Sequence, residues 1–193
     1  MSLSPDSGYL YQKLTSNNNK NIGAEEVLVK TWHYKFRTIY GIRYNVDIEE
    51  FKYELFILKF YQDKHKSHPD KYRFMTGEND CWRIFSTILN ITMEVYKKYP
   101  KGSFGFVGAR SLDETTREKT KRWVVYKRIM AQYFDPNLFK HAPDPKRSLF
   151  VALNKQMEAE VPQLWEKVLE RMEQDFLDYE ESRTGGAFTG STG

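Results

Sequence analysis

Basic side chains recur along one predicted helix at a spacing that suits contact with phosphate groups. When residues 117–134 are placed about 100° apart around a helix axis, Arg117, Lys121 and Arg128 fall in one row. Such a row can contact successive phosphates of a nucleic acid, and Arg122 flanks it. A charged row is equally typical of the solvated side of an ordinary soluble helix, so the sequence leaves both interpretations open.

A second set of cations alternates with aromatic residues in the segment "KTWHYKFRTIYGIRY", residues 30–44. The cations are Lys35, Arg37 and Arg43, and the aromatic residues beside them include Tyr34, Tyr40 and Tyr44. Tyrosine rings on an open strand can stack on unpaired bases while neighbouring cations contact the phosphates. Packing of the same rings in a hydrophobic core is the alternative interpretation. Together with the helical row, this set makes nucleic acid the leading candidate ligand.

Two histidines have a spacing that could hold a metal ion. His65 and His68 are separated by two residues, and Asp63 and Asp70 stand beside them. A structural metal site needs about four ligands, in which imidazole or thiolate groups dominate, and the sequence contains no second cluster of this kind. We therefore expect a solvated turn here and no bound metal.

One acidic group has the composition of a nuclease site, in which clustered carboxylates hold Mg²⁺. It consists of Asp47, Glu49 and Glu50, but successive residues of a strand point to opposite faces, so Glu49 and Glu50 are expected to point apart.

Cys81, beside Asp80, could be a nucleophile at a helix N-terminus, although its place on the apolar side favours a structural role. We predict no catalytic residues and no cofactor, and keep a metal-dependent nuclease as an alternative.

The composition is that of an ordinary soluble domain, since 40% of the 193 residues are hydrophobic and 29% are charged. The single cysteine excludes a disulfide within the chain and fits a reducing cytoplasm. No apolar run reaches the roughly 18 residues of a membrane span, and the N-terminal residues lack the pattern of a secretory signal. We expect a cytoplasmic protein without membrane contact.

Hydrophobic periodicity predicts several strands followed by alternating helices and strands. A period of two between Trp32 and Arg37 predicts a half-buried strand, and further strands follow it. Helical periodicity begins near Asp80, ends before Pro100 and recurs at 117–134. This order predicts an α+β fold with a curved antiparallel sheet of about five to six strands, helices packed on one face, and a C-terminal amphipathic helix.

Composition and charge divide the chain further. The expected divisions are a flexible polar segment at residues 1–25, the α+β domain at 26–155, an acidic amphipathic helix at 156–183 and a flexible tail at 184–193. Residues 1–155 contain 27 basic and 17 acidic side chains, whereas residues 156–193 contain 3 and 9. Segments of opposite charge either attract each other within the fold or mark a basic surface beside an acidic appendage.

The helices and the strand between them carry a recurring succession of residues. Asp80 precedes Thr87 by seven residues, the strand "FGFVG" follows, and Arg122 precedes Tyr126 by four residues. This succession resembles small bacterial proteins of unknown function with an aspartate, a Thr-Ile or Thr-Val helix, a strand and an Arg-x-x-x-Tyr helix. The resemblance spans about residues 30 to 155, and the loop "ARSLDETTREK" before the arginine is longer than in that pattern. It supports the predicted fold and implies no activity.

The acidic C-terminal helix suggests a second function. Its apolar stripe carries Trp165, Leu169, Met172 and Phe176. Such a stripe could dock on a second chain, which would give a homodimer or a complex with a basic partner. The helix could instead fold back and mask the basic helical row. We therefore predict a non-catalytic binding module with nucleic acid as the first candidate ligand, and a protein-interaction module as the alternative.

Overall fold

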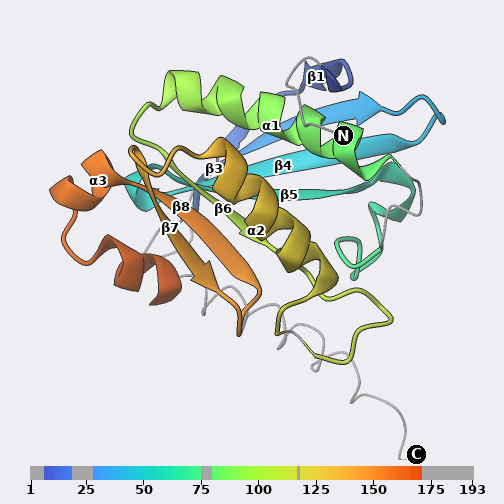
Figure 1. Ribbon diagram of the computed structural model, residues 1–193. Helices are drawn as coiled ribbons and strands as arrows, with labels where there is room; N and C mark the ends of the chain where they lie inside the picture. The colour runs from blue at the N-terminus through green and yellow to red at the C-terminus, as the bar shows by residue number, and fades with distance from the viewer. Residues whose placement is uncertain (1–6, 19–27, 75–79, 117, 171–193) are drawn as a thin grey trace, which may run out of the picture.

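The computed structural model describes residues 7–18, 28–74, 80–116 and 118–170, which form a mixed α+β fold around one open sheet (Figure 1). The strands are β1 (Tyr11–Lys13), β2 (Asn17–Asn18), β3 (Leu28–Arg37), β4 (Arg43–Phe51), β5 (Leu55–Gln62), β6 (Ser103–Val107), β7 (Phe139–Asp144) and β8 (Leu149–Asn154). The helices are α1 (Cys81–Lys98), α2 (Lys121–Tyr133), α3 (Lys155–Glu160) and a further helical segment at 164–170, with short 3₁₀ turns η2 (Lys52–Glu54) and η3 (Asp63–His65).

The sheet is larger than the sequence predicted. Its strands lie in the order β1-β3-β4-β5-β6-β8-β7, and β2 pairs with β3 beside this path. All pairs are antiparallel except β5 with β6, which is parallel. The parallel pair arises because α1 carries the chain across the sheet between these two strands, as parallel neighbours require. The expectation of a purely antiparallel sheet is therefore wrong at this position.

The additional strands include one from the segment that we expected to be flexible and one from a segment with several prolines. Part of the 1–25 segment is ordered, because β1 pairs with β3 and Tyr9 is buried and stacks on Phe36 with ring centroids 5.9 Å apart. The proline-containing segment 135–147 includes β7. Pro143 is compatible with this strand because β7 is the last strand in the described order. A proline on such a strand, which has no backbone N–H, need not break the hydrogen bonds between two strands.

Helices cover both faces of the sheet, not one as predicted. On one face α1 and α2 pack on a core that includes Tyr34, Val46 and Phe104, and Figure 1 shows these two helices against the same side. On the opposite face, α3 and the segment 164–170 cover part of the sheet. The side chains buried there include Leu55, Ile57, Leu149, Val151, Met157, Leu164 and Val168.

The two central helices agree with the sequence prediction. The apolar side of α2 is buried through Trp123, Tyr126, Ile129 and Met130, and the Thr120 side chain caps its first turn by accepting from the Trp123 N–H.

Among the described residues, none of the helices combines the length and apolar character that crossing a bilayer requires.

Candidate nucleic-acid interface

The cations predicted on the strands all point away from α1 and α2. Lys35 and Arg37 on β3 alternate with Tyr34 and Phe36, whose rings are buried in the core beneath those helices. Arg43 begins β4 and is exposed as well. Because β3 and β4 are antiparallel neighbours, the three cations gather at one end of this hairpin.

These cations line an open hollow of about 680 Å³, which we call the basic hollow. Gln12 of strand β1 and Leu10, just before that strand, bound one side of it. Lys66, directly after η3, adds a fourth cation. Asp63 is the acidic residue of this lining, and its carboxylate accepts a hydrogen bond of 2.9 Å from the Asn45 amide. No pattern in the sequence pointed to Lys66, which lies in a polar connector.

The charge pattern across the hairpin is unusual at the basic hollow. Arg37 lies directly opposite Arg43, whereas elsewhere in the same hairpin Lys30 is opposite Glu50 and His33 is opposite Asp47. Like charges placed directly opposite across two strands destabilise a sheet. In the part of the chain that the structure describes, Lys35, Arg37, Arg43 and Lys66 have no carboxylate partner. An anionic ligand would relieve this repulsion.

One of the three candidate stacking residues remains available to a ligand. Tyr40 is 58% exposed and lies in the turn that joins β3 to β4. The Arg37 Nε–H donates to the Gly41 carbonyl over 3.2 Å, which holds the guanidinium next to this turn. Tyr34 and Tyr44 are 0% and 1% exposed, so the core interpretation is correct for both of them.

The cations of α2 do not join this hollow. They lie on the outer side of the helix layer, across the sheet from the basic hollow. Lys121 forms an ion pair of 2.6 Å with Asp113, and the Arg122 guanidinium donates to the backbone carbonyls of Tyr72 and Phe74. Arg128 is exposed, and Arg117 lies outside the described residues. We therefore leave the α2 cations out of the interface.

Arg122 should matter for stability and not for nucleic-acid binding. Arg122→Ala removes two charge-assisted hydrogen bonds, so we expect the free energy of unfolding to fall by about 1.5 to 3 kcal/mol. The affinity for an oligonucleotide should stay the same. Urea unfolding and a binding titration of the same variant check both parts, with Arg128→Ala as an exposed control on the same helix. A weakened affinity for the oligonucleotide with unchanged stability would mean that Arg122 contacts nucleic acid.

The acidic group considered for Mg²⁺ does not converge. Asp47 contacts His33, and Glu49 pairs with Lys59 over 2.6 Å. Glu50 accepts from the Trp32 indole N–H over 3.0 Å on the other face, which α1 and α2 cover. The rings of His65 and His68 both pack on Phe74, with centroid distances of 3.8 and 4.9 Å. Within the described ranges, no group of three or more His, Cys, Asp or Glu side chains is arranged to hold a metal.

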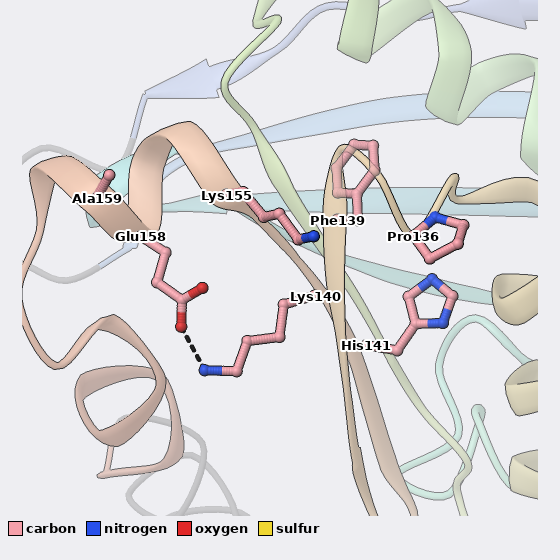
Figure 2. A pocket seen from close by; sticks show the side chains of 7 residues that line it. All are labelled: Pro136, Phe139, Lys140, His141, Lys155, Glu158 and Ala159. Carbon is pink, nitrogen blue, oxygen red and sulfur yellow. Dashed lines mark hydrogen bonds and ion pairs between the residues drawn. The ribbon is translucent and has the colours of Figure 1, made fainter.

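A second hollow of about 580 Å³ lies between β7 and α3, and Figure 2 shows its lining. Lys140 reaches across it to form an ion pair with Glu158. His141 donates its Nε2–H to the Phe134 carbonyl over 2.7 Å. Because three of its polar side chains are already engaged within the protein, this hollow is less suited to an anionic ligand than the basic hollow.

Two of the residues predicted to bind a partner contribute to the protein's own core. Trp165 and Leu169 are partly buried and pack against the second core cluster, next to Leu164 and Val168. Met172 and Phe176 lie outside the described residues. The first part of the C-terminal apolar stripe therefore packs on the protein's own sheet.

The chain matches no protein-family model, and no curated protein or solved structure matches it significantly. The resemblance to small bacterial proteins therefore stays a prediction, and the function has to be argued from the geometry of the site.

Proposed function

We propose that this protein binds single-stranded nucleic acid in the basic hollow. The observation that carries the proposal is the direct opposition of Arg37 and Arg43, with Lys35 beside them and no carboxylate partner for any of the three among the described residues. A fold gains nothing from this repulsion. A phosphate backbone would be attracted to the same charges and would release its counterions on binding.

The exposed aromatic ring favours unpaired over paired bases. Tyr40 lies in the turn next to Arg37, so a strand whose phosphates contact the cations can bring a base near the ring. Every base has a face that can stack on tyrosine, but in a duplex these faces are covered by neighbouring bases. Stacking therefore supports a ligand that is single-stranded and bound without strong sequence preference.

A salt-dependent titration tests this proposal. Fluorescence anisotropy of a labelled single strand of about 12 nucleotides should show binding whose log K falls linearly with log salt concentration. Four phosphate contacts predict a slope of about −3 for a single strand. Absence of binding at low salt, or a slope close to zero, would contradict the proposal.

Tyr40→Ala should weaken binding of a single strand and leave binding of a duplex unchanged. Loss of one stacked base costs about 1 to 3 kcal/mol, which corresponds to roughly 5- to 150-fold in affinity. Tyr53→Ala is a matched control, because Tyr53 is an exposed tyrosine outside the hollow. Equal affinities of Tyr40→Ala and the parent protein for a single strand would remove stacking from the proposal.

We further propose a cytoplasmic location. The single cysteine, Cys81, is a free thiol in the structure, which is common in a reducing compartment. The resemblance to small bacterial proteins supports a bacterial setting.

A further inference from the structure

A histidine and a carboxylate pair directly beside the basic hollow. His33 precedes Lys35 by two residues on β3, so both side chains lie on the same face of the sheet. Across the hairpin, His33 is opposite Asp47 and Lys35 is opposite Asn45. On this face of the sheet, the His33–Asp47 pair is therefore the next one after the Lys35–Asn45 pair of the hollow.

The hydrogen bonds of this pair orient the imidazole. His33 Nδ1 lies 2.8 Å from Asp47 Oδ1, and because a carboxylate accepts only, the Nδ1–H donates. In the neutral form of the imidazole, the other ring nitrogen, Nε2, then carries a lone pair. The His33 side chain is 30% exposed, and it has no other hydrogen-bond partner in the described parts of the chain. This arrangement, in which a carboxylate orients the imidazole, is typical of histidines that act as a general base.

Asp47 is held firmly behind the histidine. It is buried, and its second oxygen accepts from the Tyr72 hydroxyl over 3.3 Å. Burial, together with the negative charge of Asp47, raises the pKa of Tyr72, so this hydroxyl keeps its proton and acts as a donor. The Lys71 ammonium lies 5.0 Å from the centre of the Tyr72 ring. Asp47 is therefore a positioning residue whose own contacts keep it in place.

Lys35 supplies a proton donor at a suitable separation. Residues two apart on a strand are about 6.6 Å apart along it, so the side chains of His33 and Lys35 can flank one phosphate group. In-line displacement at phosphorus needs a base on the side of the attacking oxygen and an acid on the side of the leaving oxygen. Arg43 lies diagonally across the hairpin from Lys35 and can balance the charge that develops on the phosphate.

We propose that the basic hollow and His33 together form a ribonuclease site that cleaves single-stranded RNA through its own 2′-hydroxyl group; this rests on the proposed function. His33 Nε2 takes the proton of the 2′-hydroxyl as the O2′–P bond forms. The P–O5′ bond breaks, and O5′ takes a proton from the Lys35 ammonium. The products are a 2′,3′-cyclic phosphate and a free 5′-hydroxyl end, and proton exchange with solvent restores both side chains.

Three oligonucleotides of one sequence test this inference: RNA, DNA and 2′-O-methyl RNA, each end-labelled and incubated with the full chain in the presence of a chelator. All three should bind with similar affinity, and RNA alone should be cut, with a cyclic phosphate at the new 3′ end. Because a positioned general base contributes about 100-fold or more, His33→Gln should slow RNA cleavage by at least that factor while DNA affinity is unchanged. His68→Gln, at an exposed histidine outside the hollow, is the matched control.

Asp47→Asn separates positioning from simple structural support. It should lower the cleavage rate and leave the affinity for DNA unchanged, since Asp47 does not contact the ligand. RNA that is bound and remains intact would overturn the ribonuclease inference and leave nucleic-acid binding standing. Cleavage that persists in His33→Gln would also overturn it. Failure of all three oligonucleotides to bind would remove the proposed function and the inference together.

Discussion

A variant in which Lys35, Arg37 and Arg43 are all changed to alanine is expected to bind a single-stranded oligonucleotide about 100-fold less tightly at about 0.1 M salt. The size follows from counterion release, because each phosphate contact on a single strand contributes about 0.7 to the slope of log K against log salt. Three lost contacts therefore remove about two units of slope. Anisotropy titrations at several salt concentrations measure both quantities.

A matched variant separates a local site from overall charge. Changing Lys97, Lys127 and Arg128 to alanine removes the same net charge from α1 and α2, away from the basic hollow. This variant should keep most of the parent affinity. If both variants lose affinity equally, general attraction to a basic protein explains the binding and the basic hollow has no special role.

Leu164→Ala is expected to lower the free energy of unfolding by about 2 to 5 kcal/mol. Leu164 is 1% exposed and packs on the sheet face opposite α1 and α2 together with Val168. Truncation leaves a cavity in the buried cluster that also contains Leu149 and Val151, and the surrounding strands cannot fully close it. Urea unfolding measures the loss.

Glu166→Ala, at an exposed position of the same helical segment, is the control and should change stability by less than about 0.5 kcal/mol. The two outcomes distinguish a core helix from a detachable docking element. A stable Leu164→Ala protein with an altered mass in light scattering would mean that this segment holds a second chain and not the sheet. A loss of less than about 0.5 kcal/mol in both variants would mean that Leu164 does not stabilise the sheet.

The sequence predicted the cations of the hairpin, but not how they face each other. Arg37 and Arg43 lie three residues on either side of Tyr40, which is in the turn between β3 and β4. Pairing across a hairpin depends on the type of turn, and a shift of one residue moves every side chain to the other face. For this reason the opposition of the two arginines appears only in the structure. The same register brings His33 to Asp47, seven residues from Tyr40 on each side.

The interpretation of α2 shows a different limit. Its helical periodicity identified the buried side correctly, because burial of Trp123 and Tyr126 follows from local spacing. The contacts of its outer side depend on loops that are distant in sequence. The Arg122 guanidinium, for example, donates to backbone carbonyls about fifty residues away. Pairing of Lys121 with Asp113 depends on how the preceding loop folds back. Helical spacing alone cannot show whether a cation is available to a ligand.

The edges of the sheet were missed because isolated segments gave weak signals. Residues 11–13 are too few to form a strand on their own, and they become ordered because β3 offers an unpaired edge and the core accommodates Tyr9. Segment 139–144 contains a proline that argues against a central strand, but it forms an end strand beside β8. Both strands are stabilised by partners far away in the sequence.

The most direct test of the central claim is the stabilisation of the protein by a single-stranded oligonucleotide, measured by urea unfolding of the parent and of Arg37→Gln/Arg43→Gln. Without ligand, the variant should be as stable as the parent or slightly more stable, because it lacks the repulsion between the two arginines. With oligonucleotide at about 100 times the parent Kd and about 0.1 M salt, the parent should gain about 2.7 kcal/mol. The variant should gain only about 1 kcal/mol, because loss of two phosphate contacts weakens binding about 25-fold. An equal gain in both proteins would show that the opposed arginines do not bind nucleic acid.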